Sequence, residues 1–208
     1  MDIQSLKERW LSLNILKEAP FLDEEFSAIH EKYSEPHRHY HTIEHIKSCL
    51  ESFDLIKGDL KNPEIVELAL WLHDVIYDPK KNNNEEMSAR FAKDLLNRVG
   101  SDSTNSYSTN ELIKATKHPS TPTSHDQKYI IDIDLSILGA APEIYDKYSS
   151  QIRREYSHIP SFLYKKGRRK VLESFLSQNT IFHTEHFFST FENLARNNLE
   201  REIVGFKS

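Results

Sequence analysis

The chain of 208 residues has a single cysteine, Cys49, so no disulfide can form within it. Its 5 glycines and 8 prolines leave little room for the many tight turns of a β-rich protein. No apolar run approaches the ~20 residues of a membrane span, and the first residues (MDIQSLKERW) lack the apolar centre of a signal peptide. These absences predict a cytoplasmic protein, rich in helix, that has no membrane partner.

Negatively charged residues outnumber positively charged ones. Lys and Arg number 27 against 32 Asp and Glu, and the formal net charge is -5. No overall basic field therefore attracts nucleic acid; the local exception is the basic run at residues 165–170. Arg153, Arg168 and Arg169 are candidates for phosphate contacts, because a guanidinium matches phosphate oxygens bidentately. The alternative interpretation is that these arginines lie on solvent-exposed helix faces and contact no phosphate.

Apolar residues recur at helical spacing along most of the chain, which at this length predicts an all-α protein with a single domain over residues 1–208. Residues 101–108 (SDSTNSYS) are polar and are predicted to form a loop or linker. The helices are expected at residues 6–16, 21–33, 41–56, 63–74, 85–100, 111–117 (closed by Pro119), 142–157, 160–177 and 184–203.

The segment from Tyr129 to Leu138 permits two structures. Its alternation of apolar and acidic residues is typical of a strand, which would place Asp132 and Asp134 on one face. A helix would separate the two by about 200°, with Asp134 centred on a broad apolar face and Asp132 opposite. Because a carboxylate on an apolar face needs a partner, Asp134 is the better ligand candidate if the segment is helical.

Four further residues have the chemistry of metal ligands. His41 and His45 are four residues apart, so both would lie on one side of a helix. His73 and Asp74 follow the apolar run 65–71, where polar side chains are unfavourable unless something compensates them. Imidazole and carboxylate are good ligands for a divalent metal. The alternative is that His41 and His45 are surface residues and that His73 interacts with the dipole at the end of its helix.

Together these residues resemble the HD-domain superfamily of metal-dependent phosphohydrolases, in which a histidine, a distant His-Asp pair and a distant aspartate surround one metal. The phrase YHTIEH at residues 40–45 is similar to one in cyclic-nucleotide phosphodiesterases. The phrases RHYH, HDVIYD, NEEMSA and DLSILG resemble a group of bacterial predicted HD-superfamily hydrolases of unassigned substrate. The resemblance implies an HD-type metal-site core at about residues 37–138, with the helices at about 142–203 packed on it.

The resemblance also implies a role for each residue of the pattern. It implies His45, His73, Asp74 and Asp134 as the metal ligands, with Asp74 able to accept a proton from water as well. His41 would donate a proton to the leaving group or contact the phosphate. If His41 instead binds the metal, it joins the ligand set.

One ion is expected rather than two. Tyr77 and Asp78 lie where the phosphodiesterases have a further histidine that supports a second metal. His118 is the candidate for a second ion or for a substrate contact, and the alternative is a histidine at a helix C-terminus. Glu85 either interacts favourably with the dipole of its helix or points into the cleft and orients water or a histidine.

These roles imply hydrolysis of a phosphomonoester or phosphodiester, nucleotides included, by metal-activated water. Nitrogen and oxygen ligands suit Fe, Mn, Ni, Co or Zn, with Mg also allowed. Three alternatives stay open: an HD module that binds a nucleotide for regulation without hydrolysis, a di-iron oxygenase on the same scaffold, and a purely structural helical protein.

Overall fold

The computed structural model describes residues 1–16, 19–118 and 121–206. Within them the regular structure is entirely helical, which confirms the prediction of an all-α protein. None of the described helices is both long and apolar enough to cross a membrane. The α-helices are, in chain order, α1 (Ile3–Leu11), α2 (Leu22–Tyr33), α3 (Ile43–Ile56), α4 (Pro63–Leu72), α5 (Asn84–Arg98), α6 (Ser103–Ala115), α7 (His125–Leu135), α8 (Pro142–Glu155), α9 (Ser161–Leu176) and α10 (Glu185–Gly205). Three short 3-10 helices join them: η1 (Asn14–Leu16), η2 (Lys57–Asp59) and η3 (Ser136–Gly139).

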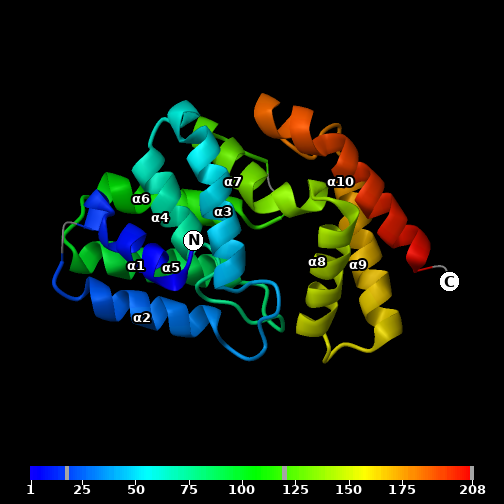
Figure 1. Ribbon diagram of the computed structural model, residues 1–208, viewed down its shortest axis with the longest axis horizontal. Coiled ribbons are helices and arrows are strands. Elements are labelled where there is room, and N and C mark those ends of the chain that lie inside the picture. Colours follow the sequence, from blue (N-terminus) through cyan, green and yellow to red (C-terminus); the bar gives the residue numbers. More distant parts are fainter. Residues whose placement is uncertain (17–18, 119–120, 207–208) are drawn as a thin grey trace.

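Helix α4 lies at the centre of the first half of the molecule. Apart from Glu64 and Glu67 it is apolar, and every residue from Leu68 to Leu72 is fully buried. It packs against α3, α5, α6 and α7. Helices α1 to α7 gather on one side in Figure 1, while α8, α9 and α10 form the other side.

Residues 101–108 are not a loop, and that prediction was wrong. Helix α6 already begins at Ser103, because the side chain of Asp102 accepts a hydrogen bond from the backbone N–H of Asn105 at 2.8 Å and caps the helix. Ser106 and Thr109 are buried, and α6 packs against both α5 and α4. The expected separate helix at 111–117 is the end of α6, and Pro119 lies outside the described residues.

The prediction that His41 begins the third helix was also wrong. Helix α3 starts at Ile43, and His41 lies in the segment before it. The carboxylate of Glu155 accepts hydrogen bonds from the backbone N–H groups of His39, Tyr40 and His41 at 2.7 to 3.0 Å. These bonds hold the segment outside the helix, so His41 and His45 do not share a helix face.

The ambiguous segment before η3 is a helix, α7. Asp132 and Asp134 therefore point in different directions. Asp132 accepts hydrogen bonds from the backbone N–H groups of His183 and Thr184, just before α10, and from the Thr184 hydroxyl at 2.7 Å. Burial raises the pKa of Asp132 to about 6, against the effect of these hydrogen bonds. Asp132 thus anchors the start of α10, and Asp134 lies on the opposite side of α7.

Helix α10 packs closely onto η3 at Gly139. A Cβ atom placed on Gly139 would lie 2.5 Å from the Cβ atom of Phe191 and 2.7 Å from its carbonyl oxygen. Only a residue without a side chain allows this approach. The glycine therefore positions Phe191 beside the end of α7.

We expect Gly139→Ala to destabilise the protein by about 1–3 kcal/mol, because the added methyl group overpacks the contact with α10. The matched control is Gly167→Ala on α9, where nothing lies within 4 Å of the added atom. That change should stabilise the helix by up to about 1 kcal/mol. Urea denaturation measures both, and an unchanged midpoint for Gly139→Ala would contradict the close packing.

Candidate metal centre

Three helices deliver the four residues that the sequence pattern predicted as ligands. His45 lies on α3, His73 and Asp74 follow the last turn of α4, and Asp134 lies on α7. Both imidazoles are almost completely buried. Since α4 is packed on all sides, its C-terminal end places His73 and Asp74 inside the molecule.

The ligand atoms of these residues converge. The Nε2 atoms of His45 and His73 are 3.2 Å apart. From His45 Nε2, the carboxylate of Asp134 is 3.1 Å away and that of Asp74 is 3.6 Å away. From His73 Nε2, Asp74 is 3.2 Å away and Asp134 is 3.6 Å away. Ligands at about 2.0–2.2 Å from one metal ion lie about 3.0–3.5 Å from each other, so the spacing fits a shared cation.

The orientation of His73 favours metal binding. Its Nδ1 atom is 2.9 Å from the carbonyl oxygen of Leu70, which can only accept a hydrogen bond. Nδ1 therefore carries a proton, and Nε2 points into the cluster, where the neutral imidazole offers its lone pair to a metal. A backbone carbonyl that fixes the tautomer in this way is typical of histidines that bind metal.

Cys49 is a neighbour of the cluster that the sequence analysis missed. One ligand atom from each of His45, Cys49, His73 and Asp134 lies within 4.8 Å of the others, and this group can hold a metal ion. Burial, together with the charges of Asp134 and Asp74, raises the pKa of the Cys49 thiol well above its usual range. Because the thiolate is the form that binds metals, Cys49 is the weakest donor of the group. Its position four residues after His45 on α3 was the available signal.

The charges of the cluster balance one another. Burial disfavours a charged His73, but the nearby Asp74 and Asp134 outweigh this effect and raise its pKa well above the usual value. Burial alone would also raise the pKa values of Asp74 and Asp134. The contact with His73 instead lowers the pKa of Asp74. Hydrogen bonds from His118 and His45 lower the pKa of Asp134. Metal binding here therefore competes with protons.

His118 lies beside Asp134, and so the fold brings this predicted residue to the site. Its Nε2 atom donates to Asp134 Oδ2 at 3.0 Å, while Asp134 Oδ1 faces His45. Within the described part of the chain, no second group of three candidate ligands gathers around His118. This arrangement favours one ion, with His118 orienting a ligand.

His41 is held next to the cluster by Glu155, which the sequence analysis also missed. His41 Nδ1 donates to Glu155 Oε2 at 2.7 Å, and the hydroxyl of Tyr77 donates to the same oxygen at 2.8 Å. The rings of His41 and Tyr77 stack with their centroids 4.2 Å apart. Glu155 is 114 residues from His41 in the chain, and nothing in its local sequence marks this role.

The contacts of His41 and Glu155 change the pKa of both groups. Burial disfavours the imidazolium, but the charge of Asp74 and the hydrogen bond with Glu155 outweigh this effect and raise the pKa of His41. Burial alone would raise the pKa of Glu155, but His41 and the backbone N–H groups lower it to about 2. The carboxylate is therefore charged at neutral pH, and it favours a protonated His41.

Arg38 is a further residue that the sequence analysis missed. Its buried guanidinium donates to the backbone carbonyl groups of His41 at 3.1 Å, Asp74 at 2.6 Å and Val75 at 3.0 Å. One side chain thus joins the segment before α3 to the segment after α4. These are the segments that carry His41 and Asp74.

The remaining predicted residues lie farther from the four candidate ligands. Glu85 is in the first turn of α5, and burial together with the charge of Asp74 raises its pKa. No hydrogen bond between Glu85 and the candidate ligands is found among the described residues. The guanidinium of Arg153 donates to backbone carbonyls at 156 and 159, that of Arg168 pairs with Glu202, and that of Arg169 donates to Ile203. These three arginines connect the C-terminal helices, and their phosphate contacts stay a prediction.

Comparisons with protein-family models, with curated proteins and with solved structures found no match for this chain.

We expect His73→Ala and Asp74→Ala to lower the affinity for a divalent metal by more than about 100-fold, since losing even an outer partner costs about 10–100-fold. Cys49→Ser should keep the metal, because the thiol is the weakest donor. Elemental analysis after dialysis measures the metal content, with the exposed His186→Ala as the control. Full metal content in Asp74→Ala would remove Asp74 from the ligand set, and loss of metal in Cys49→Ser would add Cys49 to it.

Proposed function

We propose that the protein is a metal-dependent phosphohydrolase of the HD type that acts on a small phosphate ester. The observation that carries this proposal is the convergence of two imidazole nitrogens and two carboxylates, beside a third histidine whose orientation is held by a buried glutamate. Binding the cation accounts for the four ligands. A positioned proton donor is the additional group that hydrolysis requires.

The ligand set supports one ion, held by His45, His73, Asp74 and Asp134. Two nitrogen and two oxygen donors suit Fe, Mn, Ni, Co or Zn. When bound, such an ion polarises a phosphoryl oxygen and makes a hydroxide available from water near neutral pH.

His41 supplies the proton to the leaving group. Its Nδ1 atom is committed to Glu155, so Nε2 is the atom left to donate. The raised pKa of His41 favours the protonated imidazole, which is the form that a general acid requires. As the bond from phosphorus to the leaving oxygen breaks, the proton on Nε2 passes to that oxygen.

Two carboxylates are assigned to the water that attacks phosphorus. Asp74 contacts both imidazoles through Oδ2, and its Oδ1 atom has no hydrogen bond among the described residues. Oδ1 is therefore the atom that accepts the proton released by the attacking water. Glu85, in the first turn of α5, is the second carboxylate that we assign to orienting this water.

We expect His41→Ala to keep its metal and to lose about 10²–10⁴-fold in kcat, because the proton donor is removed while the ligands stay. Turnover of benzyl phosphate and dibenzyl phosphate, whose alkoxide leaving groups need a proton, together with metal content, measures the two effects separately. Loss of metal in this variant would instead make His41 a ligand. Two irons per chain together with no turnover of either ester would favour the oxygenase alternative.

We expect Glu155→Gln to shift the pH profile as well as the rate. The variant keeps an acceptor for the three backbone N–H groups, but it loses the negative charge that raises the pKa of His41. Since His41 must be protonated to act, the decline of kcat/KM at high pH should begin at a lower pH. The control is Glu143→Gln, an exposed residue on the same helix. A lower rate with an unshifted profile would reduce Glu155 to a structural role.

A further inference from the structure

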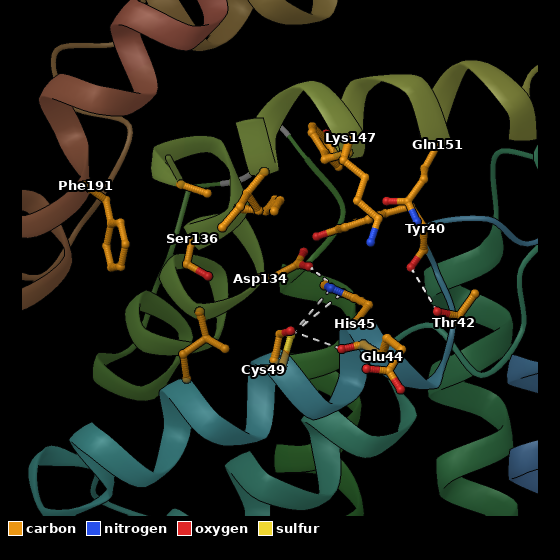
Figure 2. A pocket seen from close by; sticks show the side chains of 16 residues that line it. Tyr40, Thr42, Glu44, His45, Cys49, Asp134, Ser136, Lys147, Gln151 and Phe191 are labelled. Carbon is orange, nitrogen blue, oxygen red and sulfur yellow. Dashed lines mark hydrogen bonds and ion pairs between the residues drawn. The ribbon is translucent and has the colours of Figure 1, made fainter. Parts of the chain in front are cut away.

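A cavity of about 300 Å³ opens directly onto the cluster of candidate metal ligands. Its walls come from three parts of the chain: α3 with the segment before it, the consecutive elements α7, η3 and α8, and α10. His45 and Asp134 form part of its floor (Figure 2). The volume is at the lower end of the range of about 300–1,000 Å³ that small-molecule sites occupy.

The cavity is lined by one cationic side chain, Lys147, and by two carboxylates, Glu44 and the candidate ligand Asp134. Lys147 extends from α8 toward the floor where Asp134 and His45 lie (Figure 2). Among the described residues Lys147 forms no ion pair, and it is the one Lys or Arg among the residues that line the cavity. An ammonium group that faces the metal ligands and has no carboxylate partner is suited to bind an anionic oxygen of a ligand.

The wall that carries Lys147 is held in place. Gln151, one turn further along α8, donates from Nε2 to the backbone carbonyl of His39 at 2.8 Å. Tyr148 packs its ring edge-on against Tyr40, with the ring centroids 4.6 Å apart. Both contacts join α8 to the segment that carries His41. The cavity is therefore formed before a ligand binds.

The cavity also has an apolar lining, and Phe191 lies at the end away from His45 (Figure 2). The other apolar residues of the lining are Ile133, Ile137, Ala140 and Ile144, and Ser136 adds a hydroxyl group. Ile144 is 55% exposed and therefore contributes little to the core. The close contact at Gly139 places Phe191 at this end, away from the polar floor (Figure 2).

We infer that this cavity is the substrate site of the proposed hydrolase, and that the substrate is a phosphate ester whose organic group carries an aromatic ring. The phosphoryl group lies between the cluster and Lys147, and the ring lies against Ile144 and Phe191. This inference rests on the proposed function, because the position of the phosphoryl group depends on the cation.

The test compares benzyl phosphate with ethyl phosphate, whose leaving alcohols have similar acidity, on the metal-loaded protein. We expect kcat/KM to be about tenfold or more higher for benzyl phosphate, because only its ring buries apolar surface at Ile144 and Phe191. Ile144→Gln should reduce this ratio several-fold, while Leu55→Gln, at a position that is 78% exposed on α3 and outside the cavity, should not. Lys147→Met should raise KM for both esters about tenfold, with the exposed Lys166→Met as the control.

Binding of benzylphosphonate and ethylphosphonate, measured by calorimetry, separates the two proposals because neither compound can be hydrolysed. Equal affinities, or affinities that Ile144→Gln and Lys147→Met leave unchanged, would overturn the assignment of the cavity. A preference for benzylphosphonate that both variants weaken, with no hydrolysis of either ester, supports the cavity and contradicts the proposed hydrolase.

Discussion

The burial of two carboxylates and two imidazoles at the meeting point of α3, α4 and α7 is the constraint on which the other features of the site depend. An isolated carboxylate in this interior would be strongly unfavourable. Here Asp74 and Asp134 each lie within 3.6 Å of both imidazole Nε2 atoms, so every charge has a partner. A cation at the same place would compensate the carboxylates in the same way, which is why a group that is stable in the fold also suits metal binding.

The C-terminal helices take part in the site rather than only covering it. Helix α8 contributes Glu155, which holds the segment of His41, and Lys147, which faces the cluster. Helix α10 contributes Phe191 to the apolar lining of the cavity, and Asp132 anchors the start of that helix. The position of His41 and the cavity therefore both require the second half of the chain to be folded onto the first.

The sequence predicted part of the fold and of the candidate site, but not the local structure at residues 101–108 or at His41. The mostly apolar sequence of α4 predicted that His73 and Asp74 would be buried, and helical spacing on α7 favoured Asp134 over Asp132 as the residue that faces the cluster. The prediction failed at 101–108, where polar composition concealed a capped helix, and at His41, which Glu155 holds outside α3. In both places a side-chain hydrogen bond to the backbone decided the local structure, and apolar periodicity carries no information about such bonds.

The sequence by itself determined the helical class, most helix positions and the four residues with ligand chemistry, because periodicity and residue type are local properties that can be read along the chain. Only the tertiary structure decided that these residues converge within 3.6 Å and that Cys49 lies among them. It also decided that Glu155 and Arg38 orient the surrounding segments and that Lys147 faces the floor of a cavity. Most of these contacts join residues far apart in the chain, and their geometry depends on how the helices pack, which no single segment specifies.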